Sequence, residues 1–427
     1  MKRVVILCCC LLLMVPVYAG LTLEECRRLA REHYPEIRQY DLIRQTAEFT
    51  VANAGRAYLP QFSLSAQATW QTDVPDFPDP LKRMLEQQGV DLPGLKKGQY
   101  KVAADLNQTI WDGGKSRADR RVTEAEETEA GRSTDVDLYA LDARVDELYF
   151  GVLLLNEQIA QTLLTLELLR SNFDKVQALQ KNGVATRSDA DAVEAELLSV
   201  KQQLGQAEAA RGSYRRMLSV FIGRELGSEE LVRPEAVAVP AAVESARPEL
   251  SLFDARVGKL DAQELLVKAG VRPQFGAFAQ GYFGYPGFNF LADMMTGDGS
   301  WNAQVGVRMQ WHFGGYYTKR NSLRKIRTAQ EQVEVQRDIF LFNTRLQATQ
   351  EEGEIARLRK AIADDDRIVE LRRSVRQAAE SQLNNGVIDT DGLLRKITEE
   401  NVAAIARSAR EIELLKTIYE LKHIVNQ

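Results

Sequence analysis

The sequence predicts an α+β membrane protein made of two tandem repeats, each a strand hairpin continued into a long antiparallel coiled-coil hairpin. Three observations carry this prediction. Short motifs recur in the same order in the two halves, four segments alternate apolar and polar residues, and each half contains a long helical stretch of coiled-coil design. The first observation gives the number of repeats, and the other two give the content of each repeat.

Composition excludes several function classes before any motif is considered. Of the 427 residues, 27% are charged, which is too many for a polytopic helical membrane protein. Lys and Arg number 55 against 60 Asp and Glu, so a net charge of −5 offers no basic field for nucleic acid. With 3 His and 4 Cys there is little material for metal or nucleophile chemistry. We therefore expect no enzyme activity, no catalytic residue, no metal site and no cofactor.

The N-terminus has the design of a secretory signal peptide. A basic dipeptide at 2–3 precedes an apolar run over 4–16, and small residues follow up to Ala19. A membrane anchor is the alternative, but the run is shorter than the about 20 residues that span a bilayer. We assign residues 1–19 to the signal peptide. The mature chain then keeps one cysteine, Cys26, which has no partner for an internal disulfide.

Four sequence landmarks recur in the same order and indicate a tandem duplication. They are Tyr34-Pro35-Glu36 with Arg247-Pro248-Glu249, Leu59-Pro60-Gln61-Phe62 with Arg272-Pro273-Gln274-Phe275, Trp111-Asp112-Gly113-Gly114 with Trp311-His312-Phe313-Gly314-Gly315, and Asn182-Gly183-Val184 with Asn385-Gly386-Val387. We place the first repeat at 20–234 and the second at 241–427.

Each repeat contains two segments with the period of a β-strand. The strands are expected at about 61–72, 100–111, 274–284 and 301–313, joined by loops at 73–98 and about 284–300. Past residue 20 no stretch approaches 18 apolar residues, but strands of 10–12 residues are long enough to cross a bilayer when tilted. Apolar faces, with Leu64 and Val305, would then meet lipid. Polar faces would line water, through Ser63, Ser65, Gln67, Thr69, Lys101, Asp105, Arg308 and Gln310. An ordinary sheet over a core is the alternative.

The helical segments carry the clearest periodicity. One helix is expected from Leu23 to about Tyr58, and a much longer one over 115–181. In the longer helix, residues recurring every seven positions form a heptad seam with one polar break, composed of Val145, Val152, Ile159, Leu166 and Phe173 and, between them, Leu148, Leu155, Thr162, Leu169 and Val176. The second repeat has a long helix over about 319–382. Glycine turns lead to a return helix in each repeat, with tips at about 182–189 and 384–391. Ser188 and Asp389 are suitable N-caps for these return helices.

These features together resemble the TolC-like outer-membrane efflux proteins. The resemblance is carried by Leu21-Thr22-Leu23-Glu24-Glu25, Leu59-Pro60-Gln61-Phe62, Trp111-Asp112-Gly113-Gly114 and Asn182-Gly183-Val184-Ala185-Thr186. It implies a homotrimer in which three protomers close one 12-stranded β-barrel in outer-membrane lipid, continued by a periplasmic α-helical barrel. It further implies passive passage from periplasm to exterior for substrates delivered by an inner-membrane pump and a periplasmic adaptor (membrane fusion) protein.

The same resemblance points to the two tips. The tip turns would dock the adaptor, through Asn182, Gly183, Val184, Asn385, Gly386 and Val387. A periplasmic gate would be held by charged contacts of Asp189, Asp389, Asp391, Arg187 and Arg395. The second tip departs from the family, because Gly392 and Arg395 stand where acidic residues are common. Helix capping at a solvated tip is the alternative role for the aspartates.

Other functions have weaker support in the sequence. Gly113-Gly114-Lys115-Ser116 imitates the end of a phosphate-binding loop, but Thr109 replaces the required upstream glycine, and a strand-to-helix corner explains the motif better. His33, His312 and His423 share no ligand spacing. The remaining alternatives are the outer-membrane duct of a type I protein secretion system, a periplasmic coiled-coil scaffold without channel activity, and an exported enzyme.

Overall fold

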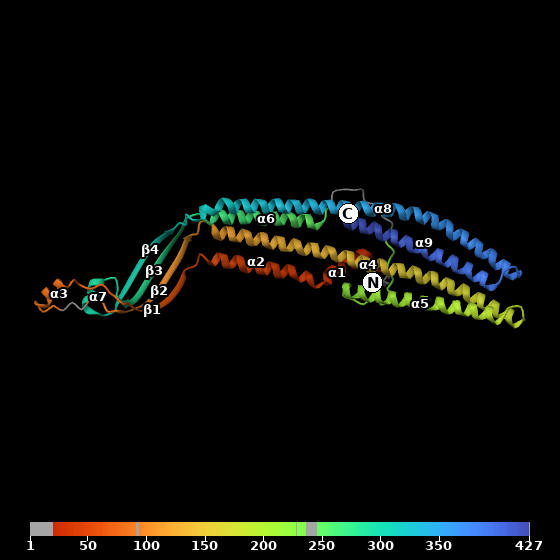
Figure 1. Ribbon diagram of the computed structural model, residues 1–427, viewed down its shortest axis with the longest axis horizontal. Helices are drawn as coiled ribbons and strands as arrows, with labels where there is room; N and C mark the ends of the chain where they lie inside the picture. Colours follow the sequence, from red (N-terminus) through yellow and green to blue (C-terminus); the bar gives the residue numbers. More distant parts are fainter. Residues whose placement is uncertain (1–19, 91–93, 228, 236–245, 427) are drawn as a thin grey trace, which may run out of the picture. The chain divides into compact units, whose positions relative to one another are not determined.

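The computed structural model describes residues 20–90, 94–227, 229–235 and 246–426, so the expected signal peptide lies outside the described residues. The two halves share the order strand, short helix, strand and two long helices, preceded by α1, η1 and α2 in the first half and by the single helix α6 in the second (Figure 1). The elements are α1 Leu23–His33, η1 Pro35–Arg38, α2 Gln39–Arg56, β1 Gln61–Trp70, α3 Asp79–Glu86, β2 Gly98–Trp111, α4 Lys115–Lys181, α5 Arg187–Ile222, α6 Pro248–Ala269, β3 Gln274–Tyr285, α7 Phe290–Thr296, β4 Ser300–Gln310, α8 Gly315–Asn384 and α9 Thr390–Val425.

The chain divides into two compact units that do not coincide with the two repeats. One unit is formed by residues up to Gln39, by Arg132–Ser251 and by Arg337–Gln427, and the other by Tyr40–Gly131 and Leu252–Gln336. Each unit therefore contains a segment from both repeats. The second unit holds the whole sheet, and the first holds both hairpin tips.

The four strands form one antiparallel sheet in the order β1-β2-β3-β4. Strands that pair in the sheet are consecutive in the sequence, so no strand is skipped. All three pairs are antiparallel. The ladder between β2 and β3 has one irregularity, between Thr109 and Trp111. Period-two alternation thus predicted the strands to within a few residues of their ends.

The helical unit is held together by the expected heptad seam. Val145, Val152 and Leu169 of α4 are almost completely buried, and Thr162 is the one polar residue at these seam positions. Near the tips, residues of α4, α5, α8 and α9 form one apolar cluster, composed of Leu169, Val176, Ala190, Val193, Val200, Ala379, Leu393, Leu394 and Ile397. Apolar contact between four helices therefore fixes the two hairpin ends against each other.

Three local expectations are corrected. The helix expected from Leu23 to about Tyr58 is interrupted at Pro35, which begins the short helix η1 because proline cannot donate the next helical hydrogen bond. The connections expected as loops contain α3 and α7. Thr186, rather than Ser188, is the N-cap of α5.

One described helix, α4, has an 18-residue window apolar enough for a membrane span by length and composition. The core helix of a non-spanning protein passes the same test, and α4 carries the seam residues described above. We therefore assign the window to helix packing.

Candidate membrane face and hairpin tips

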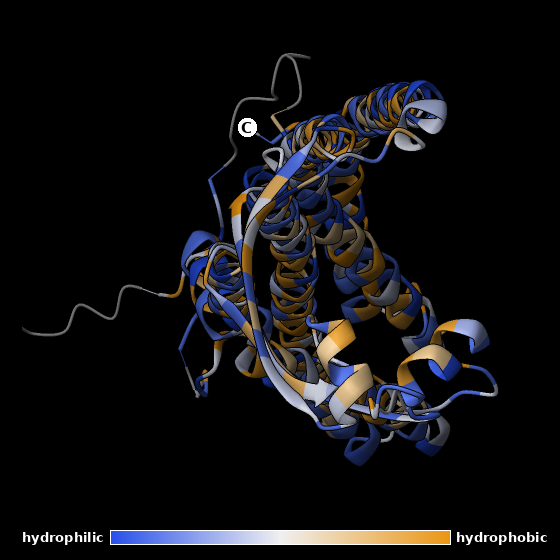
Figure 2. Ribbon diagram, turned by 90° about the vertical axis from the view of Figure 1, so that its left-hand side faces the viewer, coloured by the Kyte–Doolittle hydropathy of each residue, from blue (hydrophilic) through white to orange (hydrophobic). Residues whose placement is uncertain are grey.

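The strand register divides the sheet into one apolar and one polar face. Leu64 lies opposite Ala104, Ala104 opposite Gly281, and Gly281 opposite Ala303, so one row across the sheet is entirely apolar. Side chains on this face are open to solvent: Leu64 is 71% exposed and Val305 is 82% exposed. Figure 2 shows hydrophobic and hydrophilic residues alternating along the strands. No core of the described chain covers this apolar surface.

Aromatic side chains mark both ends of the apolar face. At one end the Phe283 ring lies 6.2 Å from Tyr100 and 5.3 Å from Trp301, measured between ring centroids. At the other end Trp111 lies 5.8 Å from Phe275. Ten residues along a strand, the spacing from Trp301 to Trp311, span about 33 Å. Tilted by about 40°, this length covers the about 25 Å apolar band that aromatic girdles flank in membrane barrels.

The opposite face carries a polar network across three strands. Gln280 of β3 accepts a hydrogen bond from Lys101 at 3.3 Å and another from Gln304 at 3.1 Å, and it donates to Asp105. The Lys101 ammonium also lies 4.2 Å from the centre of the Tyr282 ring, so the aromatic ring on this face is covered by charge. This face therefore suits contact with water.

Two strand edges are open in a single chain. Within the described residues, β1 pairs only with β2 and β4 only with β3. Each edge leaves a row of backbone donors and acceptors without a partner strand, which is unfavourable in water and far more so in hydrocarbon. The sheet is thus incomplete as a membrane element until further strands join it.

The corner between β2 and α4 explains the motif Trp111-Asp112-Gly113-Gly114. Gly113 and Gly114 have φ of +75° and +86°, a conformation that favours glycine. The Asp112 carboxylate accepts hydrogen bonds from the backbone N–H groups of Gly114 at 2.9 Å and Ser116 at 2.7 Å. Although burial opposes it, this bonding holds the pKa of Asp112 at about 2. The expected strand-to-helix corner is confirmed in place of a phosphate-binding loop.

At the first tip the predicted gate residues make local contacts. Asp189 completes a capping box, because its side chain accepts from the Thr186 N–H at 2.8 Å and its own N–H donates to the Thr186 hydroxyl at 3.2 Å. Hydrogen bonds that the Asp189 carboxylate accepts from the Thr186 hydroxyl and from the Thr186 N–H lower the pKa of Asp189. Arg187 forms an exposed ion pair at 3.7 Å with Asp191, a residue that was not predicted for the gate. Val184 is highly exposed at the turn.

At the second tip the carboxylates have different partners. Asp389 is the N-cap of α9 and accepts a hydrogen bond from the Gly392 N–H at 2.8 Å. Asp391 is paired with Arg395 one turn later, and this pair raises the pKa of Arg395. The tip turns match, since Val387 is as exposed as its counterpart in the first tip. Each carboxylate predicted for the gate therefore has a partner within its own hairpin.

Cross-helix ion pairs hold α8 to α9 below the tip. Arg376 of α8 pairs with Glu400 of α9 and also with Glu380 of its own helix. Asp365 and Asp366 of α8 pair with Arg410 and Arg407 of α9, respectively. An acidic run such as 364–366 is typical of a solvated helix face, but Asp365 is buried. Its partner on the return helix is the physical reason.

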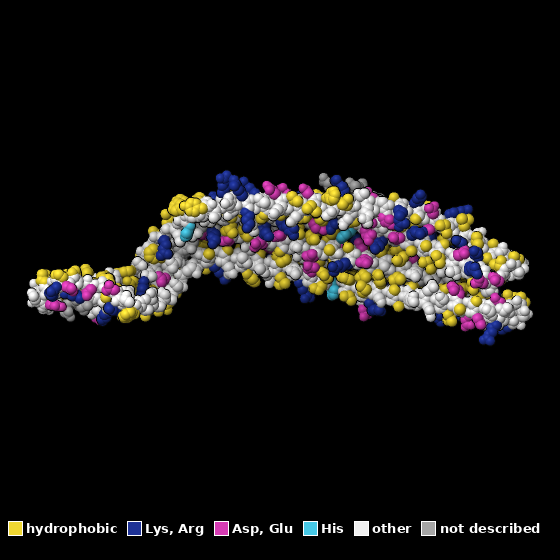
Figure 3. All heavy atoms as spheres, in the orientation of Figure 1, with side chains coloured by type: hydrophobic (Ala, Val, Ile, Leu, Met, Phe, Trp, Pro, Cys, Tyr) yellow, Lys and Arg dark blue, Asp and Glu magenta, His cyan; other side chains and the backbone are white. Residues whose placement is uncertain are grey.

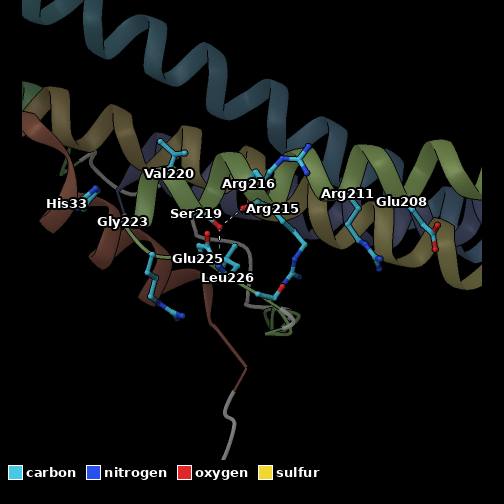
Figure 4. A pocket seen from close by; sticks show the side chains of 13 residues that line it. His33, Glu208, Arg211, Arg215, Arg216, Ser219, Val220, Gly223, Glu225 and Leu226 are labelled. Atoms are coloured by element: carbon cyan, nitrogen blue, oxygen red, sulfur yellow. Dashed lines mark hydrogen bonds between the residues drawn. The ribbon is translucent and has the colours of Figure 1, made fainter.

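An arginine-rich groove at the C-terminal end of α5 was missed by sequence reasoning. It has a volume of about 890 Å³ and lies between α5 and the loop that follows it (Figure 4). Arg215 donates to the carbonyl oxygens of Gly227 at 3.0 Å and Glu229 at 2.6 Å, and Arg224 pairs with the Glu229 carboxylate at 2.7 Å. Burial and the neighbouring Arg211 lower the pKa of Arg215. These contacts fasten the loop to α5, and we assign the groove no ligand.

Among the described residues no group of three or more His, Cys, Asp or Glu is arranged to hold a metal ion.

Comparison with known proteins agrees with these observations. Residues 27–224 match the family model described as outer membrane efflux protein. Over these residues the chain is similar to the outer membrane efflux protein family. No curated protein sequence matches the chain significantly.

Solved structures show a similar fold over 94–96% of the chain. The Campylobacter jejuni CmeC outer membrane channel has 13% sequence identity and a TM-score of 0.66, covering 96% of this chain and 86% of its own. The outer membrane protein VceC from Vibrio cholerae has 14% identity and a TM-score of 0.64, covering 94% of both chains. CusC has 12% identity and a TM-score of 0.67, covering 94% and 91%. The resemblance to TolC-like efflux proteins and the helix-rich fold with a small antiparallel sheet are confirmed.

Proposed function

We propose that this efflux-family chain forms an outer-membrane channel that gives substrates passive passage from the periplasm to the exterior. The observation that carries the proposal is the sheet with one exposed apolar face, one polar face and two open edges. An apolar surface of this size on four strands has no covering element in the described chain, and lipid is the solvent that suits it.

Trimerisation follows from the strand count and direction. The first and last strands of the antiparallel sheet run in opposite directions, so β1 of one protomer can pair with β4 of the next as another antiparallel pair. Three copies give about 12 strands, an even number within the range of bacterial barrels. The polar face, including Lys101, Asp105 and Arg308, would then line a water-filled lumen.

The partners we propose are a periplasmic adaptor and an inner-membrane pump, which deliver substrates for efflux. The two tips offer matched docking features: an Asn-Gly-Val turn in each repeat, ending in the exposed Val184 or Val387. The charged side chains beside them could form the closed gate when three copies meet at one axis. Because each of these charged side chains also has a partner within its own hairpin, opening the gate would replace contacts between protomers by contacts within one hairpin. Exposed contacts of this kind are worth about 0–1 kcal/mol each.

The proposal is tested by fractionation and single-channel recording on the mature protein. We expect it in the outer-membrane fraction, extracted only by detergent, with ion conductance in planar lipid bilayers. Extraction without detergent together with no conductance would instead indicate a periplasmic coiled-coil scaffold.

The phenotype of a deletion strain distinguishes an efflux channel from a protein secretion duct. Loss of an efflux channel sensitises cells to small toxic compounds, whereas loss of a secretion duct removes a large protein from the medium. We expect the first result, and complementation by the intact chain.

A further inference from the structure

The start of α8 carries a concentration of positive charge that the channel function does not use. From residue 299 to residue 330 the chain contains no acidic residue. The same stretch contains six basic residues, Arg308, Lys319, Arg320, Arg324, Lys325 and Arg327. Figure 3 shows basic side chains gathered over the start of α8, beside hydrophobic side chains at the end of the sheet. The charge thus lies next to the surface that we propose to be in lipid.

Helical spacing places three of the arginines on one exposed side of α8. Arg320, Arg324 and Arg327 are separated by four and three residues, so they share a face, and all three are exposed. Tyr317, one turn earlier on the same face, is 86% exposed. Ile326, on the other side of the helix, is buried. The arginine face therefore points away from the helix packing of its unit.

An exposed aromatic segment joins this face to the apolar side of the sheet. Phe313 lies between β4 and α8, and its ring is 4.6 Å from that of Trp311. The Trp311 indole donates to the Val271 carbonyl at 3.1 Å, which fixes its position. Aromatic rings followed by cationic side chains are the order in which a protein surface passes from hydrocarbon to headgroups.

The arginines also lack carboxylate partners. Within the described residues none of Arg320, Arg324 and Arg327 lies within ion-pair distance of a carboxylate. The carboxylate of Glu264 on α6, which feels the charge of Arg327, is already paired with Lys268. Their positive charge is therefore available to an external anion.

The equivalent start of α4 has no such excess. Residues 115–130 contain four basic and five acidic residues, whereas residues 315–330 contain five basic and none. Arg120 of α4 is already paired with Glu124 at 2.8 Å. The difference between two equivalent positions shows that a strand-to-helix corner does not itself require this charge.

We propose that the face formed by Tyr317, Arg320, Arg324 and Arg327 binds the headgroups of anionic phospholipid at the periplasmic surface of the outer membrane. The proposal rests on the proposed membrane insertion of the sheet. In a trimer the face is repeated three times around the barrel. Guanidinium groups bind phosphate through paired hydrogen bonds, and each basic side chain near an anionic surface strengthens the attraction several-fold.

The test is native mass spectrometry of the full mature protein in detergent, titrated with phosphatidylglycerol or with phosphatidylcholine of the same acyl chains. We expect a preference for phosphatidylglycerol of about tenfold. Replacing Arg320, Arg324 and Arg327 together by Gln should abolish the preference, and replacing them by Lys should retain most of it. Replacing Arg117, Arg120 and Arg121 of α4 by Gln is the matched control and should leave it within about twofold.

Each other outcome overturns the proposal. Equal binding of the two lipids, an unchanged preference in the α8 glutamine variant, or the same loss in the α4 control would do so. Displacement by an equal concentration of inorganic phosphate would show a free-anion site instead. Oligomeric state and conductance are measured on every variant. A conducting protein without lipid preference contradicts this inference alone, whereas a protein that neither inserts nor conducts contradicts the proposed function.

Discussion

The hairpin bundle buries its apolar residues, whereas the sheet leaves its apolar residues exposed. In the bundle, Val176 is 0% exposed and Leu169 is 1% exposed, because the four helices cover one another. In the sheet, Leu64 and Val305 remain largely exposed although their alternation is just as regular. The bundle buries its apolar side chains within one chain, whereas the sheet leaves its apolar side chains exposed. This difference supports the proposed lipid environment of the sheet and its proposed pairing with other copies of the chain.

The largest effect should come from charging the apolar face of the sheet. Val305→Arg or Leu64→Arg should greatly reduce trimer insertion, because arginine near mid-membrane costs about 2–4 kcal/mol per chain. The control Ser65→Arg changes the neighbouring residue of β1, whose side chain is on the polar face. Folded trimer is measured by gel mobility of unheated outer-membrane extracts. Equal assembly of all three variants would mean that the faces are assigned wrongly.

Next in size is a cavity in the bundle. Leu169→Ala removes a buried side chain from the four-helix cluster and should destabilise it by about 2–4 kcal/mol, seen as a lower melting temperature in detergent. Glu167→Ala, at an exposed position two residues away, should cost less than about 0.5 kcal/mol. A similar loss of stability in both variants would contradict the burial of Leu169 in the four-helix cluster.

A smaller, pH-dependent effect is expected at His423, which stacks on Tyr139 with ring centroids 4.1 Å apart. Burial, and secondarily Arg247, lower the pKa of His423 from its ordinary value of 6.5 to about 4. The folded protein then binds fewer protons than the unfolded chain between these values, so stability falls as pH drops through this window.

His423→Phe keeps a stacking ring and removes the titration. Between pH 8 and pH 5 the wild type should lose about 1–2 kcal/mol more stability than this variant, measured as the difference in melting temperature. Parallel losses in the two proteins would show that His423 is protonated freely in the folded state.

The smallest energies are expected at the tips, where a functional readout is more sensitive than stability. Asn can cap a helix without charge, so Asp189→Asn combined with Asp389→Asn should preserve the caps while removing two carboxylates. If the carboxylates hold a gate, resting single-channel conductance should rise with unchanged trimer yield. Thr186→Ala removes the capping hydroxyl and leaves the charge, and it should not raise conductance. The reverse pattern would assign the aspartates to capping alone.

Sequence periodicity was sufficient for the elements whose environment is local. Alternation assigned Leu64 and Val305 to one face, and the heptad spacing identified Val145 and Val152 as buried. The Pro35 interruption was visible in the sequence as a residue that helices avoid beyond their first turn.

Features that depend on a distant partner could not be predicted in the same way. Asp365 has the composition of a solvated acidic run, and only the proximity of Arg410 on another helix explains its burial. The choice of Thr186 over Ser188 as N-cap depends on which turn residue reaches the first free N–H groups. The partner that we propose for each open strand edge lies on another copy of the chain.

The most direct test of the account is a disulfide between β1 of one protomer and β4 of the next. In one chain these strands are three spacings apart, about 14 Å, which exceeds the about 7 Å that a disulfide can span. With Cys26→Ala as background, Ser65→Cys would be combined in turn with Asn302→Cys, Gln304→Cys and Arg308→Cys. The account predicts covalent dimers and trimers on a non-reducing gel for at least one register and none for either cysteine alone. Monomers in every combination would contradict the trimeric barrel.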